Sequence, residues 1–398
     1  MLWILPDWLT ISPGRTTMNL PLPGTDARAH SERLVQHIQE EIARCGGWIS
    51  FMRYMELALY APGMGYYTAG ARKLGAAGDF VTAPELSPLF GQTLARQVAQ
   101  LLDLGLDTIL ELGAGSGVLA AALLEELEVL GGLPRQYLIL ELSPDLRERE
   151  RDLLTARVPH LVERVAWITR LPQPLEGVLI ANEVLDAMPT HVVRSGGQGI
   201  DEAGVSTRDG GFAMAYRPAG GELRAQAEAL DLPAGTTTEI QLVAQAFMHS
   251  LAAALARGAA IFIDYGFAAH EYYHPQRNAG TLMCHYRHHA HDDPFYLPGL
   301  QDITTHVDFS AIAKVAAKEG LALAGYANQA QFLINCGITD VLAATSPEDT
   351  LRYLPLANAA NRLLSPAEMG ELFKVIAFGK GLDTPLLGFA RGDRSHTL

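Results

Sequence analysis

Thr108-Ile-Leu-Glu-Leu-Gly-Ala-Gly-Ser-Gly117 is the stretch of this sequence that decides the fold. A short apolar run that carries one acid is followed by three glycines at alternate positions, and then by a helix-forming run at 118–130. α/β proteins build nucleotide sites from this order of strand, tight glycine turn and helix start. Glycine permits a positive φ angle and lets a ligand approach the backbone closely. The stretch therefore predicts a ligand site at the carboxyl end of a strand.

From residue 108 onward, apolar runs alternate with helical periodicity, which predicts a parallel sheet flanked by helices. The predicted strands are 108–112, 137–140, 165–168, 177–181, 259–263, 321–326 and 373–378. Helices are predicted at 29–44, 49–59, 88–102, 239–257 and 308–319, with Ser50 as a cap, and another helix should begin at Ser143-Pro144. Ligands of such sheets bind at the carboxyl ends of the strands, so the polar residues that end these strands should collect in one cleft.

The remaining sequence divides into a tail, a helical region and two insertions. We predict a flexible tail at 1–28, a helical N-terminal region at 29–105, and a core made of 106–189 together with 239–390. Residues 190–238 carry paired glycines between short alternating segments, which predicts antiparallel hairpins. A loop at 266–307 is expected to be functional, because long structureless loops are uncommon in compact domains. Both insertions are predicted to cover the substrate cleft.

The charge balance and the cysteines limit the functional class. The net charge is −14 at pH 7 and the isoelectric point is near 5.4, whereas a general nucleic-acid binder needs a basic face. An acidic protein instead favours a basic substrate, such as a segment that bears Arg or Lys. Cys45, Cys284 and Cys336 are too widely separated to indicate a disulfide framework or a zinc site, which suits a reducing cytoplasm. No apolar run approaches the roughly 20 residues that span a membrane, and no signal peptide is predicted.

Two features of the sequence narrow the choice of ligand: the spacing of the glycines and the acid that ends the second strand. Gly113, Gly115 and Gly117 give G-x-G-x-G, whereas a dinucleotide site has G-x-G-x-x-G and a P-loop continues with Lys-Ser or Lys-Thr. Glu141 ends the second strand, where a carboxylate can accept both ribose hydroxyls. Together these features favour an adenosyl ligand, S-adenosylmethionine (SAM), with Glu111 bonding loop amides or the SAM ammonium group. The alternatives are a turn that only packs strand on helix, a solvated Glu141 and a structural Glu111.

Two acids follow the fourth strand, in Asn182-Glu-Val-Leu-Asp-Ala-Met-Pro189. Asn182 is predicted to contact the cofactor, and Glu183 and Asp186 are predicted to be catalytic. The guanidinium of arginine has a pKa above about 12, so acids must hold and polarise it before its nitrogen can attack a sulfonium methyl group. The alternative is that Asp186 caps a helix and Glu183 faces water.

Four histidines and two aspartates lie close together in the second insertion: His285, His288, His289, His291, Asp292 and Asp293. Their spacing matches no zinc pattern, and no pair of cysteines accompanies them. We therefore predict a substrate-binding lid and no metal site.

Several blocks of the sequence resemble a known family. They are Tyr60-Ala-Pro-Gly-Met-Gly-Tyr-Tyr67, Gly78-Asp-Phe-Val-Thr-Ala-Pro-Glu-Leu-Ser-Pro-Leu-Phe-Gly91, Glu111-Leu-Gly-Ala-Gly-Ser-Gly117, Asn182-Glu-Val-Leu-Asp-Ala-Met-Pro189, Ile263-Asp-Tyr-Gly266, Gly280-Thr-Leu282, Asp302-Ile-Thr-Thr-His-Val-Asp-Phe309 and Met369-Gly-Glu-Leu-Phe-Lys-Val375. The blocks resemble the MidA-like proteins, whose mitochondrial members are complex I assembly arginine methyltransferases. The block that begins at Gly78 is specific to that family, whereas the glycine turn alone is not.

The resemblance implies a class I SAM-dependent methyltransferase. Its fold would be an α/β, Rossmann-like sheet with a helical N-terminal region and an inserted antiparallel β/loop lid. The resemblance further implies roles for residues of the matched blocks: Asp79, Thr82 and Pro84 for the cofactor, and Glu85, Asp264, Tyr265 and His306 for the substrate. In the mitochondrial members the methylated residue is an arginine of a complex I subunit.

Residues 1–17 have no counterpart in the family pattern, and their only basic residue is Arg15, unlike a mitochondrial transit peptide. Met18 is therefore a candidate start, and a bacterial cytoplasmic member is expected. We predict a cytoplasmic SAM-dependent methyltransferase that acts on an arginine of a protein, for which a respiratory complex I subunit is a candidate. The alternatives are a small-molecule methyltransferase and an assembly factor that binds SAM without turnover. Nucleic acid and membrane are not expected partners, and the oligomeric state, a homodimer included, stays open.

Overall fold

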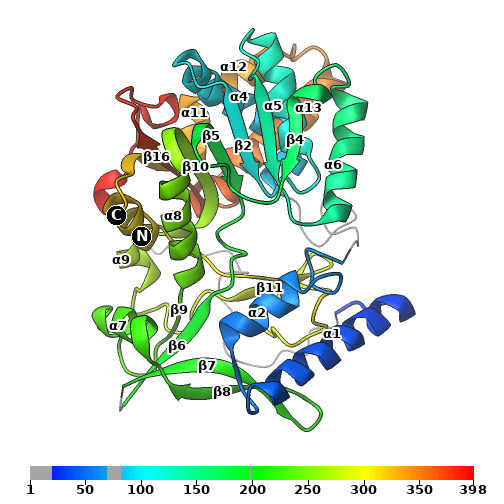
Figure 1. Ribbon diagram of the computed structural model, residues 1–398. Coiled ribbons are helices and arrows are strands. Elements are labelled where there is room, and N and C mark those ends of the chain that lie inside the picture. Colours follow the sequence, from blue (N-terminus) through cyan, green and yellow to red (C-terminus); the bar gives the residue numbers. More distant parts are fainter. Residues whose placement is uncertain (1–19, 70–81, 198) are drawn as a thin grey trace.

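The chain folds into two lobes (Figure 1). A cavity lined by residues of both lobes lies between them. The computed structural model describes residues 20–69, 82–197 and 199–398. The upper part of Figure 1 is the core lobe, which holds the main sheet and the helices on its two faces. The lower part is the lower lobe, which holds α1 (Thr25–Arg44), α2 (Phe51–Tyr60) and two smaller antiparallel sheets.

The main sheet confirms the predicted α/β fold class. Its strands lie in the order β4 (Val165–Ile168), β3 (Gln136–Leu140), β2 (Thr108–Leu112), β5 (Leu175–Asn182), β10 (Leu255–Phe267), β16 (Phe373–Lys380) and β15 (Ala322–Asn328), and β14 (Val307–Asp308) pairs with the end of β10. The first five are parallel to one another, and β16 is antiparallel to both of its neighbours. The chain order of the strands reverses between β2 and β5. Doubly wound sheets bind ligands at such a reversal, which is where the glycine turn stands.

Alternate residues of each strand pack on opposite faces of the main sheet, as the strand period of two requires. One face carries Ile109 and Ile261 and is covered by α4 (Pro88–Asp103), α5 (Val118–Val129), α6 (Pro144–Arg157), α11 (Gln329–Asn335), α12 (Ile338–Ala343) and α13 (Thr350–Leu364). The other face carries Leu110 and Phe262 and is covered by α8 (Leu242–Ala254) and α10 (Phe309–Lys318). The buried sheet between the two helix layers gives the strand ends a rigid support.

Serine caps begin two helices where the sequence predicts them. The Ser50 hydroxyl accepts a hydrogen bond from the Arg53 amide at 3.2 Å at the start of α2. The Ser143 hydroxyl accepts one from the Leu146 amide at 3.3 Å at the start of α6. Each cap satisfies an amide that has no partner within its own helix.

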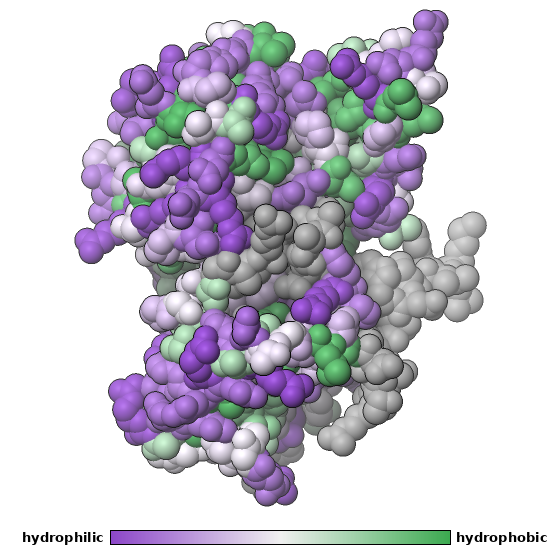
Figure 2. All heavy atoms as spheres, turned by 90° about the vertical axis from the view of Figure 1, so that its right-hand side faces the viewer, coloured by the Kyte–Doolittle hydropathy of each residue, from purple (hydrophilic) through white to green (hydrophobic). Residues whose placement is uncertain are grey.

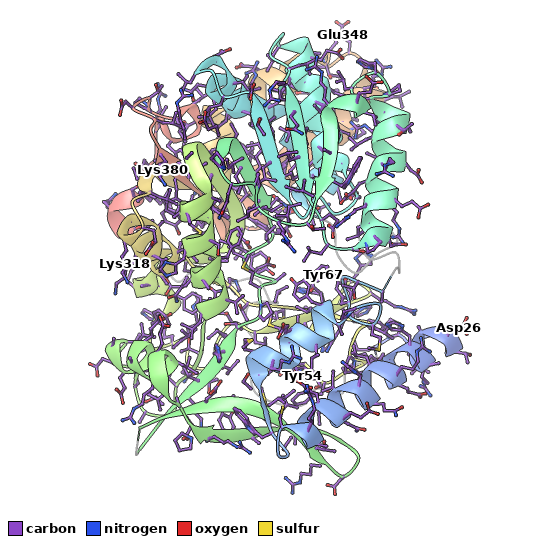
Figure 3. The ribbon with its side chains drawn as sticks, in the orientation of Figure 1. Asp26, Tyr54, Tyr67, Lys318, Glu348 and Lys380 are labelled. Carbon is purple, nitrogen blue, oxygen red and sulfur yellow. The ribbon has the colours of Figure 1, made fainter. Side chains whose placement is uncertain are left out.

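The lower lobe joins segments that are far apart in the sequence. Its larger sheet has the order β1 (Ile49–Ser50), β7 (Gly199–Arg208), β6 (His191–Gly196) and β9 (Thr237–Ile240), with β8 (Gly211–Pro218) paired to β7 and α7 (Gly221–Ala229) beside it. Its smaller sheet has the order β12 (His289–His291), β11 (Met283–Tyr286) and β13 (Asp302–Thr304). Tyr54 of α2, labelled in Figure 3, is fully buried between them. Its hydroxyl donates to the Pro294 carbonyl at 2.6 Å. The hairpins predicted for 190–238 are β6–β7 and β7–β8.

The predicted helical region at 29–105 contributes to both lobes. Helices α1 and α2 share a buried cluster with the lower-lobe sheets, whereas α4 packs on α5 in the core lobe. Helix α1 begins at Thr25, inside the predicted tail, and residues 1–19 lie outside the described part. Amphipathic periodicity reports that a helix has an apolar face and does not report which partner covers it.

Two other predictions of secondary structure were wrong. The helix predicted for 239–257 is limited to α8, because its first residues belong to β9 and its last residues extend β10. The predicted loop at 266–307 contains α9 (Ala269–Tyr272) and the strands β11, β12 and β13. These short strands pair with one another and lack the length that makes a strand visible in a sequence.

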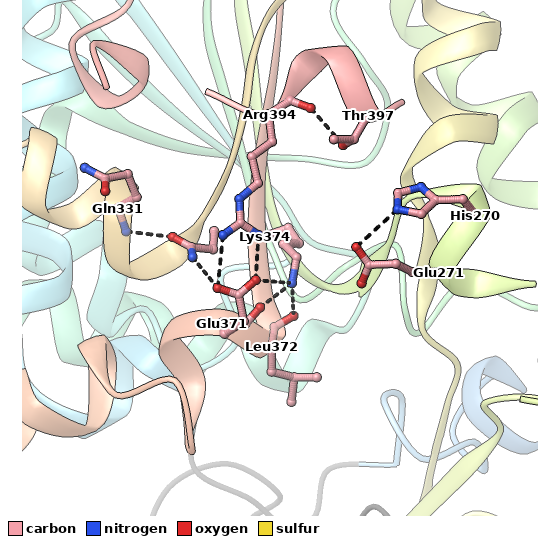
Figure 4. A network of polar contacts seen from close by, with 9 residues as sticks. His270, Glu271, Gln331, Glu371, Leu372, Lys374, Arg394 and Thr397 are labelled. Atoms are coloured by element: carbon pink, nitrogen blue, oxygen red, sulfur yellow. Dashed lines mark hydrogen bonds and ion pairs between the residues drawn. The ribbon is translucent and has the colours of Figure 1, made fainter. Parts of the chain in front are cut away.

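A polar network links residues near the end of the chain to α14 (Met369–Leu372), the short helix before β16 (Figure 4). Arg394 forms an ion pair with Glu371 at 2.6 Å. Lys374 donates to the carbonyl oxygens of Glu371 and, at 3.4 Å, of Leu372, and burial lowers the pKa of Lys374 to about 8. The network fixes the junction of α14 and β16, where Leu372 and Phe373 line the cavity.

The surface of both lobes is mostly hydrophilic on the face drawn in Figure 2, where hydrophobic residues form small separate groups. Exposed large apolar side chains are dispersed, among them Val129 at the end of α5, Leu142 after β3 and Leu351 on α13. Within the part of the chain that the structure describes, no helix combines the length and apolar character needed to cross a membrane.

Candidate active site

A cavity of about 1150 Å³ lies between the lobes, at the carboxyl ends of the parallel strands. The core lobe contributes the glycine turn, the ends of β2, β3 and β5, and the start of β16, and the lower lobe contributes the end of α2 and parts of the second insertion. The structure brings most of the predicted site residues to this cavity: Thr82, Pro84, Glu85, Glu111, Gly113, Gly115, Glu141, Asn182, Glu183, Asp186, Tyr265 and His306. Gly117 and Asp264 do not line it, and Asp79 lies outside the described residues.

The glycine turn has a backbone geometry that glycine adopts readily and other residues do not. Gly113, Gly115 and Gly117 have φ angles of +60°, +61° and +82°. The Gly113 amide donates to the Leu140 carbonyl at 3.0 Å, which joins the turn to β3. A Cβ atom on Gly117 would lie 3.2 Å from the Cα of Glu150, so Gly117 shapes the start of α5 behind the cavity wall. The turn leaves an open cradle of backbone, which fits an adenosyl ligand.

Two buried carboxylates flank the glycine turn. Tyr137 donates its hydroxyl to Glu111 at 2.6 Å, and burial raises the pKa of Glu111 to about 7. Glu141 accepts from the Ser143 amide at 2.7 Å, and burial raises the pKa of Glu141. Among the described contacts, Glu111 bonds a tyrosine hydroxyl and not the loop amides, which were one of the two partners predicted for it.

The segment before α4 stands beside the glycine turn. Thr82 is the residue before α3 (Ala83–Leu86), and Pro84 lies in the first turn of that helix. Glu85 accepts a hydrogen bond from the hydroxyl of Ser116, a residue of the glycine turn. This bond places Glu85 on the cofactor side of the cavity, whereas the resemblance implied that it binds substrate.

Glu183 and Asp186, the predicted catalytic pair, reach the cavity from the turn after β5. Glu183 has a φ angle of +52°, in the left-handed region that disfavours residues with a side chain. Its amide donates to the Ile263 carbonyl at 2.9 Å, and its Oε1 accepts from the Asn182 side chain at 3.0 Å. Asp186 accepts from the Tyr265 hydroxyl through Oδ2, while its Oδ1 is buried and has no hydrogen-bond partner within the described part of the chain.

Burial makes both acids hard to ionise, and the charge of Asp186 adds to this effect at Glu183. Burial is the largest cause of the rise in the pKa of Glu183 to about 8, and the charge of Asp186 is the second. Burial also raises the pKa of Asp186 to about 6, against the opposing hydrogen bond from Tyr265. Within the described ranges, no basic residue is among the principal groups that shift these two pKa values. A cationic ligand would therefore favour the ionised pair, because opposite charges at short range attract.

Asp264 lies beneath the turn after β5, although the resemblance implied that it binds substrate. Its Oδ2 accepts from the amides of Val184, Leu185 and Asp186 at 3.2, 2.9 and 3.3 Å. Burial, followed by the charges of Asp186 and Glu183, raises the pKa of Asp264 well above its usual value. Because its carboxylate holds the amides of the turn, we assign Asp264 as a positioning residue for the acid pair.

His306 stands beside Tyr265 in the cavity wall. Its ring meets the Tyr265 ring edge-on and stacks on Phe267, with both centroid distances 5.2 Å. Neither ring nitrogen has a hydrogen-bond partner among the described residues. Burial, with a smaller effect of the Arg277 charge, lowers the pKa of His306 to about 3, so the ring is neutral. A ligand in the cavity can find one donor and one acceptor there.

Tyr60, Tyr67 and Asp302 line the cavity from the lower lobe, and no binding role was predicted for them from the sequence. Tyr60 and Tyr67 stack with ring centroids 5.4 Å apart, and Figure 3 shows Tyr67 at the gap between the lobes. Tyr67 donates its hydroxyl to Asp302 at 2.9 Å, and Tyr60 donates to the Ala187 carbonyl at 3.0 Å. The only signal for these residues in the sequence is their position in blocks that match the family.

The histidines of the second insertion lie mostly on the small sheet. His285 belongs to β11 and His291 to β12, and burial lowers the pKa of His285 to about 4. No group of three or more His, Cys, Asp or Glu side chains with the geometry of a metal site occurs in the ranges that the structure describes.

Comparison with known proteins agrees with this geometry. A family model described as "Putative S-adenosyl-L-methionine-dependent methyltransferase" matches residues 93–327, more than half of the chain. The chain belongs to this family. The matched region runs from α4 to β15 and includes the glycine turn, the acid pair and His306.

The chain is also similar to a solved structure that contains the demethylated cofactor. A COG1565 superfamily member from Burkholderia thailandensis, bound to S-adenosylhomocysteine, is 56% identical, and the match covers 96% of this chain and 100% of that chain with a TM-score of 0.93. A curated relative, the mitochondrial protein arginine methyltransferase NDUFAF7 of Danio rerio, is 27% identical over 86% of each chain. The human protein of that name is 28% identical, over 86% of this chain and 82% of its own. This methyltransferase therefore uses SAM, and the resemblance found in the sequence is confirmed.

Proposed function

We propose that this methyltransferase transfers the methyl group of SAM to a guanidinium nitrogen of an arginine in a protein. The observation that carries the proposal is the acid pair, Glu183 and Asp186, in the cavity wall at the end of β5, with Asp186 Oδ1 unpartnered among the described residues. Two carboxylates suit a planar cation that presents several N–H donors in a fixed arrangement.

The residues that fit SAM lie together in the core lobe. Gly113 and Gly115 form the backbone cradle, and Glu111, Glu141 and Asn182 border it. The Glu141 carboxylate, at the end of β3, suits the ribose hydroxyls. When bound, SAM supplies an electrophilic methyl group on a positively charged sulfur. The surrounding carboxylates favour a cationic ligand at this end of the cavity.

The acid pair would hold and orient the substrate nitrogen. Ionised Glu183 and Asp186 accept N–H bonds from the guanidinium and fix the direction of its attacking nitrogen. Alignment of the reacting atoms contributes more to such a displacement than proton transfer does. The proton that leaves the methylated nitrogen can pass to Glu183, since its pKa of about 8 makes it a suitable acceptor near neutral pH.

The relatives support a protein as the substrate. The zebrafish and human relatives are named protein arginine methyltransferases, and we extend that activity to this chain. By the resemblance described above, a respiratory complex I subunit is the proposed partner, and the cytoplasm the proposed compartment. The net charge of −14 supports a basic segment as the target.

The test is transfer of a radiolabelled methyl group from SAM into a lysate of cells that lack the gene. We expect label in a protein, recovered as methylarginine after hydrolysis, and about 100-fold slower labelling with the Glu183→Gln enzyme, which should still bind S-adenosylhomocysteine. Label only in material smaller than a peptide would support a small-molecule methyltransferase. Stoichiometric SAM binding with no release of S-adenosylhomocysteine would support an assembly factor.

A further inference from the structure

Asp302 brings a third carboxylate to the cavity, and it comes from the lower lobe. The residue is 2% exposed, begins β13 and lines the cavity. Its Oδ1 accepts from the Tyr67 hydroxyl at 2.9 Å and from the Ile303 amide at 3.0 Å. Because β13 is also paired with β11, the carboxylate is held in a defined orientation.

Asp302 lies close enough to the acid pair to act on it electrostatically. Its charge contributes to the raised pKa of Glu183, after the larger effects of burial and Asp186. It also contributes to the raised pKa of Tyr60 and of Tyr67, for both of which burial is the larger cause. Carboxylates from two lobes therefore share one region of the cavity. Their mutual repulsion costs free energy, which a cationic ligand would relieve.

The same cavity contains buried polar atoms that have no partner among the described residues. Asp186 Oδ1 is one of them, on a side chain that is 4% exposed, and the two ring nitrogens of His306 are others. Buried polar atoms in folded proteins are nearly always hydrogen-bonded. Asp186 Oδ1 and one nitrogen of the neutral His306 ring are acceptors, so these atoms point to a ligand that carries N–H groups.

The stacked rings of Tyr60 and Tyr67 form an aromatic wall next to Asp302. Their planes are 25° apart, and both residues line the cavity. Both hydroxyls are bonded, to Ala187 and to Asp302, which fixes the rings. Aromatic rings attract cations, and a guanidinium is a favoured partner.

We propose that Asp302 is a specificity-determining residue of the substrate subsite and that Tyr67 positions it. The guanidinium is then held between the lobes, by Glu183 and Asp186 from the core lobe and by Asp302 from the lower lobe. The inference rests on the proposed function, because it assigns further contacts to the same arginine. A neutral side chain of the same shape leaves the carboxylates uncompensated and binds poorly.

The test compares a charged probe with a neutral probe of the same shape. N-acetyl-arginine amide carries a guanidinium, and N-acetyl-citrulline amide replaces it with a urea group. The affinity for each is measured by NMR titration on the full-length protein saturated with S-adenosylhomocysteine, for the wild type, Asp302→Asn and Glu183→Gln. Asp293→Asn is the matched control, because it removes the same charge from the same insertion at a residue that does not line the cavity.

We expect the wild type and Asp293→Asn to prefer the arginine probe. Asp302→Asn should lose about tenfold in affinity for the arginine probe alone, the size of one hydrogen bond to a charged group. Its affinity for S-adenosylhomocysteine should not change. The inference is overturned if Asp302→Asn keeps the wild-type ratio of the two affinities, or if it loses cofactor affinity as well. The proposed function fails separately, if the wild type does not distinguish the probes and Glu183→Gln has no effect.

The Tyr67→Phe variant tests the positioning role. It keeps the stacked ring and removes the hydroxyl that bonds Asp302. We expect about a threefold loss in affinity for the arginine probe and none for the citrulline probe, because the carboxylate stays but is held less firmly. A wild-type ratio of the two affinities would overturn the role of Tyr67.

Discussion

The two halves of the cavity are built in different ways. The cofactor half comes from the core lobe, where the glycine turn supplies backbone and the ends of β2 and β3 supply Glu111 and Glu141. The substrate half joins the turn after β5 to Tyr67 and Asp302 of the lower lobe. Backbone geometry dominates the first half, and charged side chains held by hydrogen bonds dominate the second. Backbone changes should therefore act on cofactor binding, and charge changes on the substrate.

The largest effect is expected from Gly115→Val. Gly115 has a φ angle of +61°, which a β-branched residue adopts only with strain, so the cradle should deform. We expect at least about a 100-fold loss of affinity for S-adenosylhomocysteine, roughly 3 kcal/mol. Calorimetric titration measures it, with circular dichroism as the control for folding. Wild-type affinity would show that the turn does not bind the cofactor.

Glu183→Gln should leave the cofactor half intact and impair the substrate half. The amide keeps the shape of the side chain but cannot hold the guanidinium as a charge or accept its proton. We expect kcat/KM to fall by about 100-fold or more with cofactor affinity unchanged. Steady-state kinetics and cofactor titration on the same preparation check both. Parallel loss of cofactor affinity would contradict the division of the cavity into two halves.

The pH dependence of kcat/KM in the wild type tests the role of the acids in the substrate half of the cavity. Arginine binding needs both acids ionised, and their pKa values are raised to about 8 for Glu183 and about 6 for Asp186. We expect kcat/KM to rise as the pH increases through this range, because kcat/KM reports the free enzyme. In Glu183→Gln the remaining rise should be complete soon after pH 6. A flat profile in the wild type would contradict the role of the acids.

Asp264→Ala should have a moderate effect that is confined to the substrate half. The change removes the acceptor of three amides in the turn after β5, so the turn should loosen. We expect a loss of about 2 kcal/mol in the free energy of unfolding, together with about a tenfold fall in kcat/KM. Urea denaturation and kinetics measure the two effects. Asp264→Asn, which keeps one oxygen, should lose less.

The smallest effect concerns the pH dependence of stability. The folded state raises the pKa of Glu111 to about 7 and those of Glu150 and Glu183 to about 8, from a usual value of 4.5. The folded protein therefore binds more protons than the unfolded chain in this window, and stability falls as the pH rises through it. We expect Tm to be roughly a few degrees lower at alkaline pH than at mildly acidic pH. Glu150→Gln should reduce the dependence of Tm on pH. An unchanged dependence would contradict the contribution of Glu150.

The core lobe could be predicted from the sequence because its signals are local. The predicted bounds of β2 match the structure, and Ser143 caps α6 as expected, since each feature depends on neighbouring residues. The helices and hairpins of the lower lobe could be predicted singly, but their assembly could not, because the buried cluster joins residues such as Leu34, Val192 and Ile303. Periodicity in one segment carries no information about which distant segment covers it.

The candidate site could also be predicted only in part, because the sequence does not give the direction of each side chain. The acids that end β2 and β3 reach the cavity as predicted, because the ends of parallel strands meet at one edge of the sheet. Asp264 follows its predicted strand in the same way, but its side chain lies beneath the turn after β5 and bonds the amides of that turn. The direction of one side chain depends on amides that only the folded structure brings near. In the sequence, Asp302 stood out only as part of a matched block. Its proposed role depends on Tyr67, which is distant in the sequence and bonds it in the folded structure.

The left-handed backbone of Glu183 has a consequence for protein engineering. At a φ angle of +52°, glycine would remove about 1 kcal/mol of strain, and it would also remove a buried acid that resists ionisation. A Glu183→Gly protein should therefore melt at a higher temperature than the wild type and have no activity. A screen that selects for heat resistance alone would favour inactive variants at this position. Directed evolution of this enzyme has to score methyl transfer in every round.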